Sequence, residues 1–310
     1  ALSWHWIFFI NVPIGVAAVA VAIPVLPADR GLGVKAGADV LGAVLVTGGL
    51  MAGIYAVVAH QPAAGIGSAV LLIAFVVRQA IARTPLMPLR IFRTRSVSVA
   101  NGVQVLMVAA LFSFQILFAL YLQQVQGYGA TATGLAMLPA ALTIGAVSLG
   151  VAARLNARFG ERSVLLAGLA LLIGMLVLLT RVPVRADYAT DLLPLMFLAA
   201  GFGLALPALT SLGMSGATPD DAGLASGVFN TTQQIGMALG VAVLSTLAAA
   251  RTESLRGSQG EAAALTGGYH AAFAVGAALL VVAFVLALTL RRRQTPTTAP
   301  EVPDPTNVSV

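Results

Sequence analysis

Nine apolar stretches, each long enough to cross a lipid bilayer, dominate the sequence. An α-helix needs about 20 predominantly apolar residues to span the hydrocarbon layer. The stretches cover residues 5–26, 39–59, 66–83, 98–122, 132–153, 162–180, 191–212, 224–248 and 269–290. Lipid offers no hydrogen-bond partners to a bare backbone, and the short alternating segments of a barrel do not occur in the sequence. We therefore predict an all-α membrane protein with nine transmembrane helices.

The composition excludes a soluble protein and several kinds of site. Only 9% of the 310 residues are charged, whereas soluble domains carry roughly 25% charged residues. The chain has no cysteine, and its histidines, His5, His60 and His270, lie far apart, so we predict no metal site and no cofactor. The net charge of +6 comes mostly from arginines in short loops, which is typical of membrane topology and not of nucleic-acid binding.

The basic residues predict an orientation in the membrane. Four of the 17, Arg181, Arg185, Arg251 and Arg256, belong to one set of alternating loops. The other 13 belong to the opposite set, which the positive-inside rule places in the cytoplasm. These are Arg30, Lys35, Arg78, Arg83, Arg90, Arg93, Arg95, Arg154, Arg158, Arg162, Arg291, Arg292 and Arg293. Residue 1 is then outside, and the Pro- and Thr-rich tail 291–310 is a disordered cytoplasmic segment.

The start of the chain fits this orientation. Trp4 and Trp6 precede a long apolar run, and tryptophan prefers the headgroup layer, so they mark the outer end of the first helix. The chain begins with Ala1 and lacks the charged start and cleavage site of a signal peptide. We therefore expect that an N-terminal part of a longer protein precedes it.

Polar side chains follow one face of the stretch 98–122. Asn101, Gln104 and Gln115 align there, because eleven residues make close to three helical turns. Polar groups within the membrane are costly and usually face a bundle interior or a water-filled cavity. We predict that this stripe faces a cavity.

The stretch 224–248 carries a second polar face, with Asn230, Gln233 and Gln234 at helical spacing. Two interpretations stay open here: the amides line a cavity, or they form interhelical hydrogen bonds that only hold the bundle together. Four glycines form two small-xxx-small steps that allow another helix to approach closely. These are Gly223, Gly227, Gly236 and Gly240.

Acidic residues are absent from the interior of all nine stretches, since Asp39 and Asp191 lie at edges. Proton-driven transport needs a titratable group that a proton can reach within the membrane. The sequence also lacks a nucleophile–base–acid set, a phosphate-binding loop and a metal-binding cluster. We predict that the chain is not an enzyme and that any proton-coupling residue lies outside it.

Four stretches resemble a known family. WHWIFFINVPIG, at residues 4–15, resembles the sixth-helix segment of the 14-helix drug:proton antiporters of the major facilitator superfamily. ALYLQQVQGYGATATGLAMLP (119–139) is similar to the junction of the seventh and eighth helices. GLASGVFNTTQQIGMALGVAVL (223–244) and YHAAFAVGAALL (269–280) are similar to the eleventh and twelfth.

This resemblance implies a domain organisation. Residues 1–83 would hold the sixth helix and two extra central helices, 84–290 the C-terminal six-helix bundle, and 291–310 the tail. The superfamily lines its central cavity with helices seven, eight, ten and eleven of this half. The implied cavity residues are Asn101, Gln104, Gln115, Asn230, Gln233 and Gln234, with Phe112 and Phe118 packing against flat apolar ligands.

The loop RLNARFGER (154–162) resembles the second-half copy of the superfamily's cytoplasmic gating motif. Arg158, Gly160 and Arg162 match the motif, whereas Ala157 replaces its acid, so the implied gating role is a weak one.

The resemblance implies proton-coupled efflux of drugs or other amphiphilic small molecules by alternating access. The partners would be the substrate, protons, the bilayer of a bacterial inner membrane and an N-terminal half, without which residues 1–310 would not transport. Two alternatives stay open. One is an exporter of an endogenous metabolite, lipid or siderophore, and the other is a truncated membrane protein that does not transport.

Overall fold

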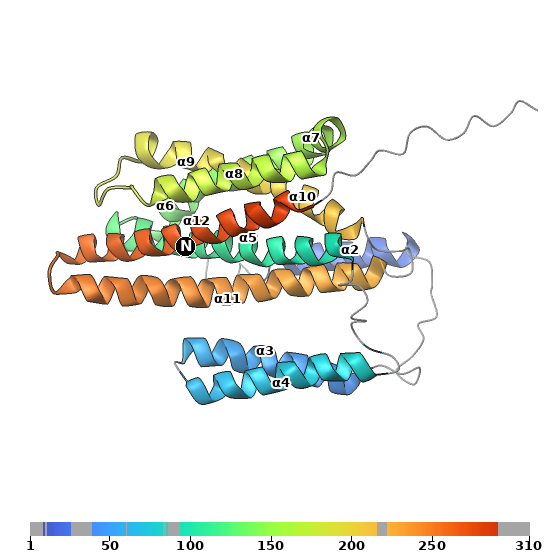
Figure 1. The fold of residues 1–310 in the computed structure, drawn as a ribbon. Helices are drawn as coiled ribbons and strands as arrows, with labels where there is room; N and C mark the ends of the chain where they lie inside the picture. Colours follow the sequence, from blue (N-terminus) through green and yellow to red (C-terminus); the bar gives the residue numbers. More distant parts are fainter. Residues whose placement is uncertain are drawn as a thin grey trace, which may run out of the picture. The chain divides into compact units, whose positions relative to one another are not determined.

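The computed structural model describes residues 9, 11–25, 39–59, 61–82, 85, 94–215 and 222–290. All regular structure among these residues is helical, which confirms the predicted all-α class (Figure 1). The predictions for Trp4, Trp6 and the tail 291–310 fall outside the described residues. Seven helices of the described part are long and apolar enough to cross a membrane, and Asn11–Val25 and Val40–Ala56 are shorter apolar helices.

The chain divides into two compact units between Asp39 and Val40. The first contains helix α2 (Asn11–Val25). The predicted boundary at residue 83 stays a prediction. The helices of the second unit are α3 (Val40–Val58), α4 (Pro62–Ile81), α5 (Arg95–Leu120), α6 (Ala130–Ala146), α7 (Ala152–Phe159), α8 (Glu161–Leu179), α9 (Leu193–Leu198), α10 (Ala200–Met214), α11 (Ala222–Arg256) and α12 (Glu261–Leu288).

Helices α3 and α4 form a hairpin held by small residues. Gly49 lies so close to α4 that a side chain at its position would come within 2.8 Å of Leu72. The Ser68 hydroxyl donates a hydrogen bond to the Gly49 carbonyl over 2.7 Å. A polar group buried in an apolar helix pair is thereby satisfied.

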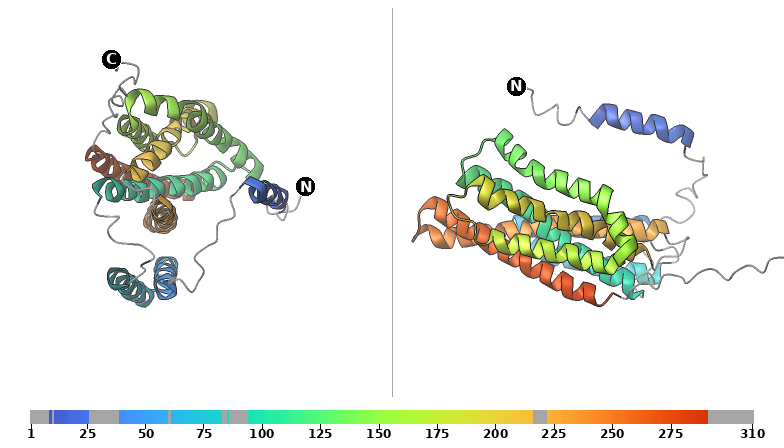
Figure 2. Two further views of the ribbon diagram at one scale, coloured as in Figure 1. Left: turned by 90° about the vertical axis from the view of Figure 1, so that its right-hand side faces the viewer. Right: turned by 90° about the horizontal axis from the view of Figure 1, so that it is seen from above.

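Helices α5 to α12 form a bundle in which α5, α11 and α12 lie side by side, and α8 packs between α10 and α12 (Figures 1 and 2). One apolar cluster runs through it and includes the fully buried Met107, Leu169 and Leu280. Three short π-helical segments interrupt the spans, at Tyr121–Val125, Val147–Val151 and Tyr188–Leu192.

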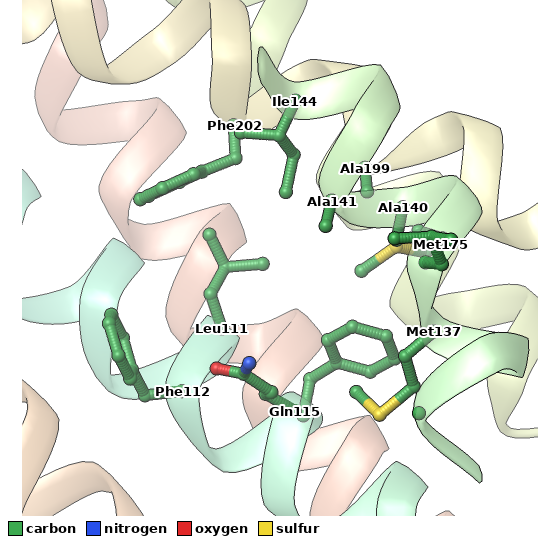
Figure 3. Close-up of a pocket in the computed structure, with 13 residues that line it drawn as sticks. Leu111, Phe112, Gln115, Met137, Ala140, Ala141, Ile144, Met175, Ala199 and Phe202 are labelled. Atoms are coloured by element: carbon green, nitrogen blue, oxygen red, sulfur yellow. The ribbon is translucent and has the colours of Figure 1, made fainter. Parts of the chain in front are cut away.

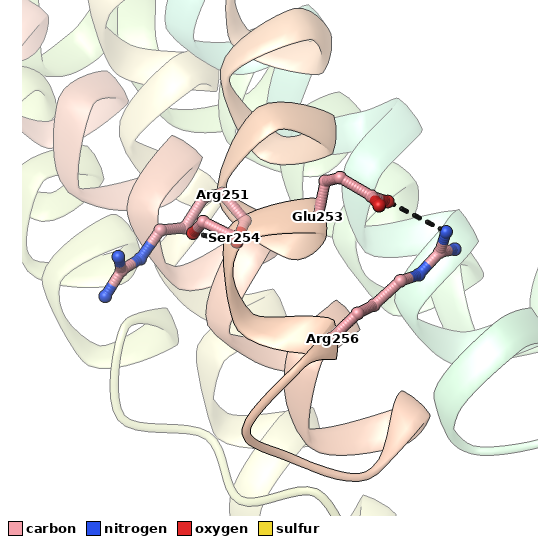
Figure 4. Close-up of polar contacts among 4 residues, drawn as sticks. All are labelled: Arg251, Glu253, Ser254 and Arg256. Carbon is pink, nitrogen blue, oxygen red and sulfur yellow. Dashed lines mark hydrogen bonds and ion pairs between the residues drawn. The ribbon is translucent and has the colours of Figure 1, made fainter.

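Helix α11 is longer than the predicted span 224–248. It continues to Arg256, and α12 begins already at Glu261, so most of the expected loop is helical. Its 35 residues make a helix of about 52 Å, against roughly 30 Å of hydrocarbon. Apolar composition marks the part of a helix that lies in lipid, whereas hydrogen bonding lets the helix continue into water. The extension carries Arg251, Glu253, Ser254 and Arg256 (Figure 4).

Two of the four predicted packing glycines lie at a tight helix contact. A side chain at Gly240 would overlap the backbone of Ala109 in α5, and one at Gly236 would come within 2.8 Å of the Val105 carbonyl oxygen. At Gly223 and Gly227, an added side-chain carbon would have no atom of the described residues within 4 Å. The second small-xxx-small step therefore brings α11 against α5, whereas the first does not lie at a close helix contact within the described part of the chain.

We expect Gly240→Ala to lower the free energy of unfolding by about 1–3 kcal/mol, because the new methyl group must push two backbones apart. Gly227→Ala, in the same helix, is the matched control. It should be neutral or stabilise by up to ~1 kcal/mol, since alanine is the better helix former. Unfolding of the purified protein in detergent measures both. Equal effects of the two substitutions would contradict the assigned contact.

Candidate functional site

A pocket of about 410 Å³ opens between α5, α6 and α10 (Figure 3). Its lining is apolar except for one carboxamide. In the close-up, Phe202 and Ile144 lie across the open space from Gln115 and Met137. The lining residues are Leu111, Phe112, Phe114, Gln115, Gly134, Met137, Leu138, Ala140, Ala141, Ile144, Met175, Ala199 and Phe202.

Small residues and a helix break create this space. In α6, Met137, Ala141 and Ile144 follow the three- and four-residue spacing of one helix face, and alanine leaves the middle of that face hollow. The span that carries Phe202 is interrupted at Ala199, between α9 and α10. Gly203 then lets α10 approach α6, because a side chain there would lie 2.7 Å from the Ile144 carbonyl oxygen.

The pocket suits a ligand bound mainly through apolar surface. Aromatic and thioether side chains adapt well to flat ligands, and a few polar groups set orientation. No lining residue is charged. A cation entering would lose hydration worth several kcal/mol without a countercharge from this wall. The phenylalanine faces would return only about 0.5–2 kcal/mol through cation–π contact.

The structure brings two of the predicted cavity residues together in this pocket, Phe112 and Gln115. Gln115 is exposed and has no hydrogen-bond partner among the described residues. Phe118 does not line the pocket, since it is fully buried. Its ring stacks on Phe114 at 5.4 Å and on Tyr121 at 6.1 Å.

Asn101 and Gln104 lie deeper, on the same helix as Gln115, and do not line the pocket. The Asn101 amide donates to the Val97 carbonyl over 2.9 Å. The Asn101 side-chain oxygen and both polar atoms of Gln104 are buried without a partner among the described residues. An unpaired buried carboxamide costs about 1–3 kcal/mol, which calls for a functional or solvent-related explanation.

The amides of α11 do not reach the pocket either. Asn230 and Gln234 are exposed, Gln233 is half-buried, and none of the three makes a hydrogen bond to another helix within the described part. The described structure therefore does not support the interpretation that these three amides only form interhelical hydrogen bonds. That they face a cavity stays a prediction.

Sequence reasoning missed Phe114, Met137, Met175 and Phe202 as pocket residues. Each is an apolar residue within an apolar span, so its type and spacing carry no signal that separates pocket from lipid or core. Only the helix break at Ala199 and the small residues of α6 could have pointed to their location.

Polar contacts tie together one end of the bundle, which we call the Arg162 end. The Arg162 guanidinium donates to the Leu288 carbonyl at the C-terminus of α12 over 2.6 Å, and the Ser96 hydroxyl donates to the Leu212 carbonyl over 2.8 Å. Ser211 in α10 bonds to Glu161 in α8. These bonds connect α5, α8, α10 and α12.

Two other predicted loop residues have local roles at this end. Gly160 joins α7 to α8 with φ +81°, a left-handed conformation that glycine adopts without strain. Arg158 is exposed, and its guanidinium lies 5.3 Å from the centre of the Phe159 ring. Arg162 alone among the predicted gating residues reaches another helix through a hydrogen bond in the described structure.

Tyrosines connect the opposite end, which we call the Tyr188 end. Tyr121 donates to the Pro183 carbonyl, Tyr188 to the Ala136 carbonyl and Tyr269 to the Gln124 side-chain oxygen, each over 2.8 Å. These bonds give each phenol hydroxyl a partner. The first two hold the segment after α8 against Tyr121, at the end of α5, and against α6.

The charged residues at the Tyr188 end are exposed, except Asp191, which is half-buried. The N–H groups of Ala189 and Thr190 donate to the Asp187 carboxylate and hold its pKa below the usual range. At the end of α11, Glu253 and Arg256 form an ion pair of 3.0 Å (Figure 4). Such exposed pairs contribute little to stability. The described residues contain no cluster of three potential metal ligands.

Comparison with known proteins identifies relatives of this chain. A family model described as Major Facilitator Superfamily matches residues 1–241. The chain is 30% identical over 305 residues to the puromycin resistance protein pur8 of Streptomyces alboniger, covering 93% of this chain and 60% of that protein.

Two further relatives are export proteins by name. The cephamycin export protein CmcT of Amycolatopsis lactamdurans is 35% identical over 302 residues, 92% of this chain and 60% of the relative. The tetracenomycin C resistance and export protein of Streptomyces glaucescens is 31% identical over 264 residues, 81% of this chain and 48% of the relative. The chain thus spans about half to three fifths of the length of these relatives.

We expect Arg162→Met to destabilise the bundle by about 1.5–3 kcal/mol, the range for a hydrogen bond to a charged group. Arg158→Met is the control, because Arg158 is exposed and its guanidinium lies beside the neighbouring Phe159 ring. Its loss should stay within about 0.5–1 kcal/mol. Detergent unfolding of the two variants compares them. A larger effect at Arg158 would refute the assigned role of Arg162.

Proposed function

The chain belongs to the Major Facilitator Superfamily, a family of transmembrane transporters and not of enzymes, and from this premise we propose proton-coupled export of amphiphilic small molecules. It would work by alternating access, as the C-terminal part of a longer carrier in the cytoplasmic membrane of a bacterium. The observation that carries the proposal is the apolar pocket with its single carboxamide, Gln115.

The relatives support a drug-like cargo. Their names refer to puromycin resistance, cephamycin export and tetracenomycin C export. A pocket lined by phenylalanine, methionine and alanine binds by apolar area, which tolerates different scaffolds better than a hydrogen-bonded site does. An endogenous metabolite, lipid or siderophore would be exported by the same route. A truncated chain that does not transport remains the second candidate.

We propose that the Arg162 end faces the cytoplasm. Among the described residues of α5 to α12, the arginines divide equally, with Arg95, Arg154, Arg158 and Arg162 at this end and Arg181, Arg185, Arg251 and Arg256 at the other. The excess that supports the orientation comes from Arg83, Arg90, Arg93 and residues 291–293, all outside the described residues.

Proton coupling would depend on a residue outside this chain. The described carboxylates of the six-helix bundle lie at helix ends or in loops: Glu161, Asp187, Asp191, Glu253 and Glu261. None of the lining residues of the pocket titrates near neutral pH. In vesicles that contain the complete carrier, a pH gradient should drive uptake of a substrate and a protonophore should abolish it. Export by residues 1–310 alone would contradict the proposal that the proton-coupling residue lies outside this chain.

The buried amides suggest how the route to the pocket opens. At the Arg162 end, Val97 of α5 packs against Ala225 of α11, with Met214 of α10 beside them. Asn101 and Gln104 follow Val97 along α5, towards Gln115. We propose that the three helices separate at this end during transport, and that water or substrate then reaches the two amides.

Filling the pocket should stop transport. We expect Ala141→Trp to lower the export rate at least about tenfold, since loss of ~1.4 kcal/mol of ligand binding gives that factor. Leu142→Trp is the neighbouring control, because Leu142 is exposed and does not line the pocket. Rates are measured with the complete carrier in vesicles. Unimpaired export by the Ala141 variant would refute the pocket assignment.

The absence of cysteine from residues 1–310 permits an accessibility test of the route. In a carrier free of other cysteines, Gln104→Cys should react with a membrane-impermeant thiol reagent during turnover and only slowly at rest. Ser113→Cys is the control, since Ser113 is buried and bonded to the Ala109 carbonyl. If turnover leaves the labelling of residue 104 unchanged, the proposed opening is wrong.

A further inference from the structure

We infer that Gln115 is a specificity-determining residue, which selects planar, uncharged ligands that carry a carbonyl beside an N–H or O–H group. This rests on the proposed function and narrows it to a substrate class. The ligand's ring system would lie among the aromatic and methionine side chains of the pocket. Its donor–acceptor edge would meet the Gln115 carboxamide.

The first support is the isolation of this carboxamide. Of the 13 residues that line the pocket, Gln115 alone has a polar side chain. It is exposed, and no hydrogen bond to a described residue occupies its donor or acceptor. A primary amide presents one oxygen and one NH₂ group side by side, so the group that satisfies both is another amide, a lactam or a hydroxycarbonyl.

The second support is the shape and chemistry of the walls. Phe114 and Phe202 contribute flat apolar surface. The flexible side chains of Met137 and Met175 can adapt to the outline of a ligand (Figure 3). When a ligand buries its rings here, its polar edge can form a hydrogen bond to one side chain of the lining, because Gln115 is the sole polar side chain there. Orientation within the pocket is therefore set by one residue.

The third support is the absence of charge around the pocket. The described acidic residues nearest in sequence to its lining are Asp191, Asp187 and Glu161, which lie in or directly before the first turns of helical segments at opposite ends of the bundle. Gln104, the nearest described carboxamide along α5 towards the Arg162 end, is buried and does not line the pocket. A permanent cation placed beside Gln115 would meet dipoles but no countercharge on this wall.

Three probes that share one planar, fused tricyclic skeleton test the inference with the purified complete carrier. 6(5H)-Phenanthridinone carries a lactam edge, phenanthrene carries none, and N-methylphenanthridinium is a permanent cation. Gln115→Leu should weaken binding of the lactam about tenfold, the loss expected for one neutral hydrogen-bonded group. Binding of phenanthrene should change by less than about twofold, because its contacts are apolar.

Gln115→Glu, measured at mildly alkaline pH, should raise the affinity for the cation about tenfold, since it adds the missing countercharge with the same shape. Gln259→Leu and Gln259→Glu are matched controls in the exposed turn between α11 and α12, and should change neither affinity.

The outcomes separate the inference from the function. Equal changes for lactam and phenanthrene in Gln115→Leu, or no gain for the cation in Gln115→Glu, overturn the inference. Proton-driven export of another amphiphile without binding of the lactam also overturns the inference and leaves the proposed function standing. If the complete carrier neither binds a probe nor exports any amphiphile, the proposed function fails together with the inference.

Discussion

Helices within lipid gain nothing by hiding apolar side chains from each other, because the surrounding lipid is equally apolar. Close backbone contact must hold them instead, and in this bundle glycine provides it. Gly240 brings α11 onto the backbone of Ala109, and Gly168 and Gly201 bring α8 and α10 together. Gly268 lets α12 approach Ala248 of α11. Of these contacts, the one at Gly240 holds α11 against α5, and the others join α8 to α10 and α11 to α12.

The pocket is a consequence of the same packing. Gly203 brings α10 against α6 near Ile144, and the break at Ala199 then turns the chain beside the resulting space. The alanines of α6 leave the space open, and Gln115 of α5 projects its amide into it. Close contact at one level and small side chains at the next therefore produce the cavity.

The two ends of the bundle are held differently. At the Arg162 end, the Arg162 guanidinium donates to the carbonyl of Leu288, the last residue of α12, where the helix dipole favours a cation. At the Tyr188 end, Tyr121 and Tyr188 donate to backbone carbonyls, and Tyr269 donates to the Gln124 side-chain oxygen. The rings of Tyr121 and Tyr269 also pack edge to face. Hydrogen bonds to single carbonyls can be exchanged without unfolding a helix. Such bonds are compatible with the movement between alternative packings that the proposed alternating access would require.

The membrane class and the helical fold were determined by the sequence, because a bilayer imposes one length, one hydrogen-bond solution and one charge rule on every span. The relation to transporters came from the resemblance of particular stretches, such as residues 4–15 and 223–244, to a known family. Gln115 and Phe112 were also predictable as pocket residues, since they lie on an aligned polar stripe and beside it. The exclusion of Phe118, the burial of Gln104 and the role of Phe202 depended on tertiary structure. Spacing along one helix defines a face, but a neighbouring helix decides what that face meets. In a membrane protein, the positions that face lipid are apolar as well. Residue type therefore does not show which face of a helix packs against another helix.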